Sequence, residues 1–286
     1  MRGQDTEDHE VRPPNAPDED TGPSPDLVIR VPVTRLRDGR ASEDTDSVAR
    51  ESSLVLLVDG RTVCRLQCSP GQFEELALGF LCTSGLLPPQ MEEVPIACDT
   101  QETETRVDVS LGVPDEDLAQ LRENLVAGTG CGLGMFSVKG FDPLDCRRKI
   151  DMSFRIKAAE LSDAMRAFQK HSTVYRETGG VHSAGIADGT ELVAFAEDVG
   201  RHNAVDKVIG CCLRKGLPMH DKVVLSTGRL SLDLVAKAVR AGLPVAASRS
   251  APTDAAVELA RLANLTLAGF VRGDRMNVYT AEWRIE

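Results

Sequence analysis

The strongest constraint on the fold is a regular alternation of predicted strands and helices in the second half of the chain. Apolar runs typical of buried strands alternate with amphipathic helical patterns at 191–196, 202–215, 222–226, 231–241, 244–248, 252–264 and 266–270. A helix around 161–168 and a Gly-rich strand around 178–187 precede this series, and a strand at 277–280 ends it. Gly216 and Gly242 directly follow two of the helices, as expected at helix C-termini. Because parallel strands need helical crossovers, the pattern predicts a largely parallel, three-layer α/β domain.

The first half of the chain is richer in strand signals. An Asp-Gly pair at 59–60 between two apolar runs, and a second pair of runs at 94–98 and 105–111, indicate two β-hairpins. Apolar residues spaced as on one face of a helix occupy 73–81. Residues 27–127 therefore predict a smaller α+β domain.

The first 26 residues form an acidic segment with few apolar side chains. They hold eight of the 44 acids, two of the 33 basic side chains and five prolines, and so account for −6 of the formal net charge of −11. Such a composition cannot bury enough apolar surface to order the chain, and we expect a disordered tail. The expected organisation is a tail, a small α+β domain, a Gly-rich active loop with linker, and an α/β domain, at 1–26, 27–127, 128–150 and 151–286.

Charge and hydropathy exclude several classes of protein. A net charge of −11 argues against sequence-independent binding to nucleic acid or to an anionic membrane, because both require a basic excess. The start of the chain lacks a signal-peptide pattern, and no apolar run approaches the ~18 residues of a membrane span. We therefore expect a cytoplasmic protein that binds neither nucleic acid nor membrane, with eight cysteines that are thiols rather than disulfides.

Arginines gather in the loops that follow four predicted strands, where open α/β sheets bind their ligands. They are Arg201, Arg229, Arg249, Arg272 and Arg275. Three of the loops lead into a predicted helix N-terminus, whose free N–H groups favour an anion. A single arginine commonly pairs with a local acid, and the acids at hand are Glu197, Asp198, Asp233 and Asp274. The set of five favours a phosphate-rich ligand, and His182 and His202 are candidates for acid–base or ligand roles.

A Gly-rich segment surrounds one cysteine, Cys131, in the sequence GTGCGLG at 128–134. Alternating glycines leave a thiol unshielded, which suits a thiolate nucleophile or a sulfur carrier. A Gly-rich linker with an incidental cysteine explains the pattern equally well. Cys82, Cys211 and Cys212 fall on helical patterns and predict buried, inert thiols.

Five motifs carry a more specific signal. They are TGGVHSA at 178–184, EDVGRHNAVDK at 197–207, STGR at 226–229, SAP at 250–252 and FVRGDRMNVY at 270–279. With them the chain resembles the formate dehydrogenase accessory sulfurtransferase family, FdhD. The resemblance covers about residues 27–280 and leaves out the acidic tail.

The resemblance implies an enzyme, a sulfurtransferase that takes sulfane sulfur from a cysteine desulfurase as a cysteine persulfide. It implies transfer of that sulfur to the bis-molybdopterin guanine dinucleotide molybdenum cofactor, which is bound as a substrate through its GDP-like moieties and is required by formate dehydrogenase. The persulfide falls on Cys131, and no resident metal is expected. The family's cofactor-binding segment falls on Phe270, Val271, Arg272, Gly273, Asp274 and Arg275. The arginine loops would extend this site to Arg201, His202, Arg229, Arg249 and His182. The resemblance also implies a cytidine-deaminase-like α/β domain and a homodimer.

The chain departs from the family at the reactive loop. The family shows Cys-Gly-x-Cys, whereas this chain has Cys131-Gly132-Leu133-Gly134. One cysteine suffices to hold a persulfide, but a second would release the sulfur by forming a disulfide; Cys146 is a candidate substitute.

Two other functions compete with sulfur transfer. One is a non-catalytic chaperone that binds the molybdenum cofactor or a guanine nucleotide through the arginine loops. The missing second cysteine favours this alternative. The other is a zinc-binding hydrolase that uses Cys131 with His182 or His202. A deaminase is disfavoured, because His182-Ser-Ala and the absence of a Cys-x-x-Cys pair do not match the deaminase zinc signature.

Overall fold

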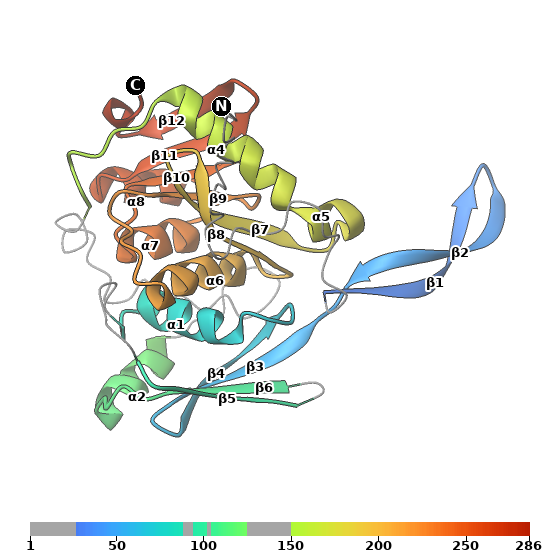
Figure 1. The fold of residues 1–286 in the computed structure, drawn as a ribbon, viewed down its shortest axis with the longest axis horizontal. Helices are drawn as coiled ribbons and strands as arrows, with labels where there is room; N and C mark the ends of the chain where they lie inside the picture. Colours follow the sequence, from blue (N-terminus) through green and yellow to red (C-terminus); the bar gives the residue numbers. More distant parts are fainter. Residues whose placement is uncertain (1–26, 88–93, 102–103, 125–149) are drawn as a thin grey trace, which may run out of the picture.

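A computed structural model describes residues 27–87, 94–101, 104–124 and 150–286 (Figure 1). The acidic tail and the Gly-rich segment with Cys131 and Cys146 lie outside these residues, so the structure leaves the predictions for them as they stand. No helix within the described ranges is both long and apolar enough to cross a membrane.

The second half of the chain forms a six-stranded sheet with the order β12-β11-β10-β9-β7-β8. Its strands are β7 (His182–Asp188), β8 (Glu191–Asp198), β9 (Val223–Ser226), β10 (Val245–Ser248), β11 (Thr266–Arg272) and β12 (Arg275–Thr280). The prediction of a largely parallel sheet is wrong, because only β9–β10 and β10–β11 pair in parallel. Short turns join β7 to β8 and β11 to β12, and such turns allow only antiparallel pairing. The fold is therefore mixed α/β.

Helices cover both faces of this sheet (Figure 1). They are α4 (Ala158–His171) on one face and α6 (Arg201–Arg214), α7 (Leu232–Arg240) and α8 (Asp254–Leu262) on the other. Alternate residues of one strand serve the two faces: Val224 joins the core with α6 to α8, while Val223 and Leu225 join the core with α4. The likeness of this domain to the cytidine deaminase fold stays a prediction.

The predicted strand at 178–187 begins later than expected. A short helix, α5 (Thr173–Thr178), occupies the residues just before it, and β7 starts at His182. The Glu197 carboxylate accepts hydrogen bonds from the N–H groups of Val174 and Tyr175, both at 2.9 Å. These bonds satisfy N–H groups in the first turn of α5. They cannot be predicted from the local sequence, because Glu197 lies on β8, about twenty residues further along the chain.

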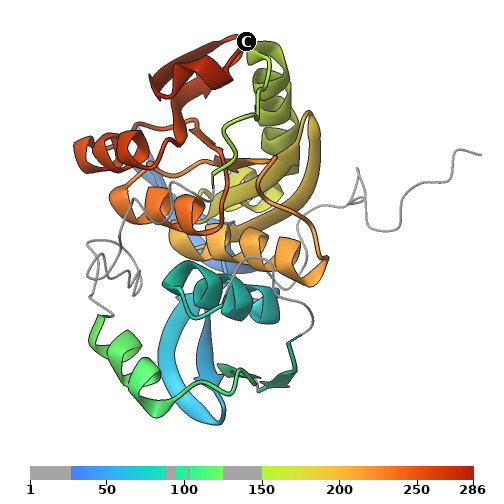
Figure 2. The same ribbon diagram turned by 90° about the vertical axis from the view of Figure 1, so that its left-hand side faces the viewer.

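The first half of the chain forms a four-stranded sheet with the order β4-β3-β6-β5, covered by helix α1 (Figure 2). The strands are β3 (Ser52–Val58), β4 (Arg61–Cys68), β5 (Ile96–Thr100) and β6 (Glu104–Val109); the helices are α1 (Phe73–Ser84) and α2 (Asp115–Asn124). Both predicted hairpins are confirmed. Asp59 and Gly60 have φ of 51° and 75°, the left-handed values that the first hairpin turn requires.

Helices α1 and α6 cross in direct backbone contact between the two sheets (Figure 2). A Cβ atom on Gly79 would lie 1.8 Å from the carbonyl oxygen of Asp206, and one on Gly210 would lie 1.9 Å from the carbonyl oxygen of Glu75. Only glycine fits at either position, so this pair of glycines sets the distance between the helices.

A two-stranded ribbon, β1 (Val28–Arg37) with β2 (Arg40–Ala49), extends away from the rest of the protein (Figure 1). We did not predict it, although its Asp38-Gly39 turn repeats the hairpin signal at 59–60, with φ of 50° and 75°. The side chains of β2 are mostly polar, and pairing with β1 rather than a buried face makes this segment a strand. The ribbon meets the body at its base, where Ala49 lies next to Gly180.

Candidate functional site

The arginine-bearing segments lie at one edge of the six-stranded sheet. The carboxyl ends of β8, β9, β10 and β11 share this edge with the start of β7, as the pairing of His182 with Asp198 and of Ser226 with Ser248 shows. Helices α6, α7 and α8 begin close to this edge. The prediction that these segments lie together is therefore confirmed.

Hydrogen bonds and a close contact tie the segments of the edge to one another. The Ser248 hydroxyl donates to the Gly228 carbonyl at 2.6 Å, and the Phe270 N–H donates to the Ser250 carbonyl at 3.1 Å. A Cβ atom on Gly228 would lie 3.0 Å from the Cβ of Arg201, so the loop after β9 approaches the start of α6 closely. The edge is a single connected surface.

The arginines occupy different depths at this edge. Arg201 is the first residue of α6 and is half-buried, while Arg229, Arg272 and Arg275 are exposed. The guanidinium of Arg272 donates to the carbonyl of Arg249 at 3.2 and 3.3 Å. The Nε of Arg249 is buried, with no hydrogen-bond partner among the described residues.

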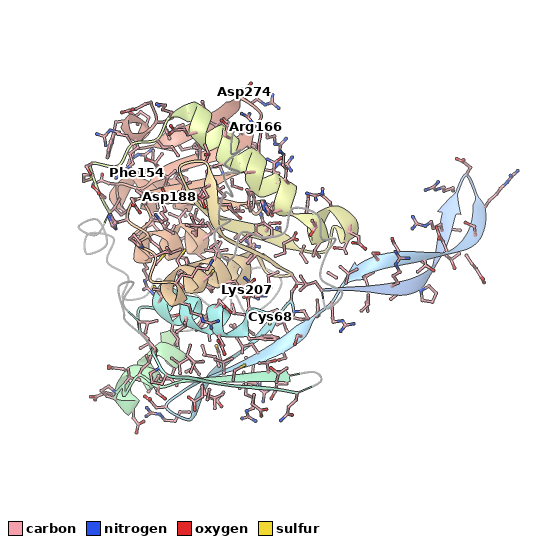
Figure 3. The ribbon with its side chains drawn as sticks, viewed as in Figure 1. Cys68, Phe154, Arg166, Asp188, Lys207 and Asp274 are labelled. Carbon is pink, nitrogen blue, oxygen red and sulfur yellow. The ribbon has the colours of Figure 1, made fainter. Side chains whose placement is uncertain are left out.

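Three of the four local acids are engaged elsewhere, while burial raises the pKa of the fourth, Asp233, and nearby Lys237 and Arg201 oppose that rise. Glu197 binds the start of α5, Asp198 pairs with Lys207 at 2.7 Å, and Asp274 pairs with Arg166 of α4 at 3.0 Å (Figure 3). Within the described part of the chain, no ion pair joins an acid to Arg229, Arg249, Arg272 or Arg275. Positive charge therefore remains available at the edge.

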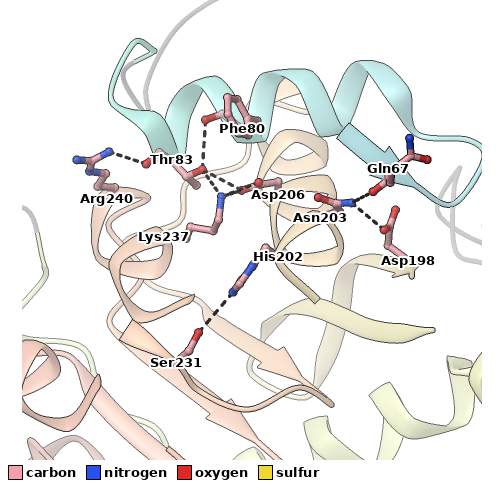
Figure 4. Close-up of polar contacts among 10 residues, drawn as sticks. All are labelled: Gln67, Phe80, Thr83, Asp198, His202, Asn203, Asp206, Ser231, Lys237 and Arg240. Carbon is pink, nitrogen blue, oxygen red and sulfur yellow. Dashed lines mark hydrogen bonds and ion pairs between the residues drawn. The ribbon is translucent and has the colours of Figure 1, made fainter. Parts of the chain in front are cut away.

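The two candidate histidines are held as neutral imidazoles. Burial lowers the pKa of His202 to about 3, with further lowering by Lys237 and Arg201. Burial also lowers the pKa of His182, and Arg201 and Arg229 add to the effect. A ring nitrogen of His182 lies 3.4 Å from the Thr227 hydroxyl. A ring nitrogen of His202 lies 3.4 Å from the Ser231 hydroxyl (Figure 4). Both rings offer uncharged polar atoms to a ligand at neutral pH.

The segment 270–275 is part of a hairpin rather than a loop, because β11 runs to Arg272 and β12 starts at Arg275. Phe270 has a left-handed φ of 54° at an irregularity of the β11–β12 pairing, and its ring is 38% exposed. Val271 points into the core with α4, and Asp274 faces Arg166. Among these residues, Phe270 and Arg272 are the ones in contact with the neighbouring loops of the edge.

The sequence analysis missed a buried group of residues behind the edge: Asp198, Asn203 and Lys207 together with Ser69. We call this group the clamp. It links the start of α6 to the turn between β4 and α1. Figure 4 shows Asn203 between Asp198 and Gln67, and Figure 3 labels Lys207. Its signal was present in the EDVGRHNAVDK motif, which carries Asp, Asn and Lys at spacings of five and four residues.

The described cysteines fit an inert role with one exception. Burial raises the pKa of Cys64, Cys68 and Cys212 to about 12, and it also raises the pKa of Cys211. The expectation of burial is confirmed for Cys82 and Cys212, whereas Cys211 is only half-buried, and Cys98 alone of the described cysteines is exposed. The described residues contain no cluster of His, Cys, Asp and Glu able to hold a metal ion.

Together these features define a mixed α/β protein with arginines gathered at one edge of its six-stranded sheet. A sequence profile of the FdhD/NarQ family matches residues 49–286, and the chain belongs to this family. It is similar to the sulfur carrier protein FdhD of Bacillus pumilus (strain SAFR-032), with 33% identity over 269 residues that cover 92% of this chain and 99% of that protein. The corresponding protein of Shouchella clausii (strain KSM-K16) is 34% identical over 259 residues, which cover 89% of this chain and 95% of that one.

A solved structure is also similar. It is a crystal structure from Desulfotalea psychrophila described as a formate dehydrogenase accessory protein, and it superposes with a TM-score of 0.71 at 26% identity. The match covers 91% of this chain and all of that one.

Proposed function

We propose that this protein is a sulfur carrier that serves formate dehydrogenase. In this proposal Cys131 receives sulfane sulfur from a cysteine desulfurase, and the cationic edge holds the bis-molybdopterin guanine dinucleotide cofactor that accepts it. The names of the relatives support sulfur transfer and the link to formate dehydrogenase. The proposal rests on one observation: arginines converge at the edge of the six-stranded sheet, while Glu197, Asp198 and Asp274 bind elsewhere.

The cofactor is a substrate of suitable chemistry for this edge. Each of its guanine dinucleotide halves carries a pyrophosphate, and guanidinium groups bind phosphate oxygens through paired hydrogen bonds. Arg249 has a buried Nε without a partner, which a phosphate oxygen would satisfy. The neutral His182 and His202 would add polar contacts without repelling the arginines. The exposed ring of Phe270 offers a flat surface to a base.

The sulfur chemistry proposed for Cys131 has two steps. Its thiolate attacks the outer sulfur of the desulfurase persulfide, which breaks the donor S–S bond and releases the donor thiolate. A second thiolate then attacks the Cys131 sulfur, expels the outer sulfur as hydrosulfide for the metal, and forms a disulfide with Cys131. Gly134 stands where the family has its second cysteine. Cys146 or an external thiol therefore supplies the second thiolate.

The decisive experiment is activation of a formate dehydrogenase that lacks its cofactor sulfur. Wild type supplied with desulfurase and cysteine should activate this client, and Cys131→Ala should not. Intact mass spectrometry should show a gain of about 32 Da, one sulfur atom, on wild type alone. Sulfur loading that persists in Cys131→Ala would refute the role of Cys131.

The absence of the second loop cysteine favours one alternative, a chaperone that delivers the cofactor without persulfide chemistry. In that case Cys131→Ala would activate the client as well as wild type does, while substitution of Arg249 would abolish activation. The client assay thus separates the two functions, because both require cofactor binding but only sulfur transfer requires the thiol.

A homodimer is a further part of the proposal. The ribbon of β1 and β2 is available for contacts with a second copy, with the desulfurase or with the client, since Leu36 near its tip is 74% exposed. Light scattering on the full chain measures the oligomeric state directly.

A further inference from the structure

The clamp is organised around the buried carboxylate of Asp198, the last residue of β8. Its Oδ1 accepts hydrogen bonds from the N–H of Gly200 at 2.8 Å and from Nδ2 of Asn203 at 3.0 Å. Its Oδ2 accepts from the N–H of Ser69 at 3.0 Å and pairs with Nζ of Lys207 at 2.7 Å. A buried carboxylate with four donors is fully satisfied and fixed in place.

Ser69 brings the second sheet into this network. Its hydroxyl accepts a hydrogen bond from the N–H of Val199 at 3.1 Å, and its carbonyl accepts from Nζ of Lys207 at 2.9 Å. Asn203 also donates to the carbonyl of Gln67 at 2.7 Å. All three polar atoms of Ser69 are therefore bound to the segment from Asp198 to Lys207.

Arg201 and His202 lie between the two ends of this network in the sequence. They begin α6, and the clamp holds the backbone N–H groups of Val199 and Gly200 before them and the side chain of Asn203 after them. Arg201 then lies against Gly228, and His202 against Ser231, at the ligand edge.

We propose that the clamp is a positioning unit that presents Arg201 and His202 to the phosphate groups of the ligand. Because Ser69 belongs to the turn after β4, the geometry of the ligand edge depends on the docking of the four-stranded sheet. This proposal rests on the proposed function, since it takes the ligand of the edge to be a guanine nucleotide moiety. Asp198, Asn203 and Lys207 act through Arg201 and His202.

A second buried pair on α6 provides a matched comparison (Figure 4). Lys237 of α7 pairs with Asp206 at 2.7 Å and also donates to the Thr83 hydroxyl at 3.0 Å. This pair is as deeply buried as Lys207 with Asp198 and likewise joins α6 to α1. Among the hydrogen bonds of the described residues, this pair has none to residues 198–203. Loss of either lysine removes one buried positive charge near the edge, but only loss of Lys207 loosens the start of α6.

The test measures binding of GDP and of guanosine to the full chain, by calorimetry and below the melting temperature of each variant. Lys207→Met is compared with Lys237→Met. The milder Ser69→Ala is compared with Thr83→Ala, because each removes one buried hydroxyl. Should Lys207→Met fail to fold, the serine and threonine pair decides alone.

Misplacement of Arg201 should weaken GDP binding by about tenfold, the loss of about one charged contact, and leave guanosine binding near the wild-type value. We expect this loss of preference for GDP in Lys207→Met and, to a smaller degree, in Ser69→Ala, but not in Lys237→Met or Thr83→Ala. Two results would overturn the role of the clamp. One is an unchanged preference for GDP over guanosine in Lys207→Met and Ser69→Ala. The other is a loss of that preference that is equal in Lys237→Met and Thr83→Ala. If wild type itself bound no GDP, the proposed cofactor edge would fail and the clamp proposal with it.

Discussion

His202 should make the stability of this protein depend on pH in mild acid. Burial lowers its pKa in the folded state to about 3, whereas an exposed histidine titrates near 6.5. The folded state therefore keeps the ring neutral while the unfolded state takes up a proton below pH 6.5. Above pH 6.5 His202 does not reduce the free energy of unfolding. As the pH falls from 6.5 toward 3, protonation of the unfolded state progressively lowers that free energy.

The size of the effect follows from the two pKa values. Between pH 7 and pH 5 the unfolded state becomes almost fully protonated at this site and the folded state does not. The free energy of unfolding should then fall by about 2 kcal/mol through His202 alone. His182, whose pKa is also lowered by burial, shifts stability in the same direction.

Urea unfolding of wild type and of His202→Gln at pH 7 and pH 5 measures this contribution. The variant should lose about 2 kcal/mol less than wild type between the two pH values, because glutamine does not titrate. His220→Gln is the matched control for the substitution itself, since it makes the same change at an exposed histidine. Equal losses in wild type and His202→Gln would show that His202 is not held neutral by burial, and the account of the edge as uncharged at its histidines would be wrong.

Three further predictions follow from the same structure. Gly79→Ala should lower the free energy of unfolding by at least about 2 kcal/mol, because a Cβ 1.8 Å from the Asp206 carbonyl forces α1 and α6 apart; a gain in stability, the usual result of Gly→Ala inside a helix, would contradict the contact. Arg249→Ala should weaken GDP binding about tenfold with little change in melting temperature, and calorimetry that finds wild-type affinity would remove Arg249 from the site. Glu197→Gln should destabilise the protein by about 1–3 kcal/mol in thermal unfolding, because the Val174 and Tyr175 N–H groups lose a charged acceptor; an unchanged melting temperature would contradict this role.

Local patterns predicted most elements of the fold correctly. The Asp-Gly turn at 59–60 and the apolar spacing at 73–81 each describe contacts between residues close in sequence, and such contacts are visible in a single chain. The ribbon at 28–49 was missed because its second strand has no apolar alternation, so only its turn carried a signal.

Partners that are distant in sequence accounted for the errors and omissions. The number of parallel strand pairs was overestimated. The β7–β8 hairpin adds to the sheet through antiparallel pairing of β7 with β9, and no short segment of the sequence encodes this pairing. The clamp was overlooked because Arg201, three residues from Asp198, is the nearer candidate partner in the sequence. In the folded protein Asp198 instead binds Lys207 and Ser69.

The sequence by itself determined most of the secondary-structure elements, the family and the five arginines that follow predicted strands. Only the tertiary structure decided that the arginines share one edge, that Asp198 and Asp274 pair with lysine and arginine elsewhere, and that His202 is neutral. The physical reason is that charge pairing and burial depend on distances in space. The six-stranded sheet, the crossing of α1 with α6 and the clamp fix those distances between residues far apart in the chain.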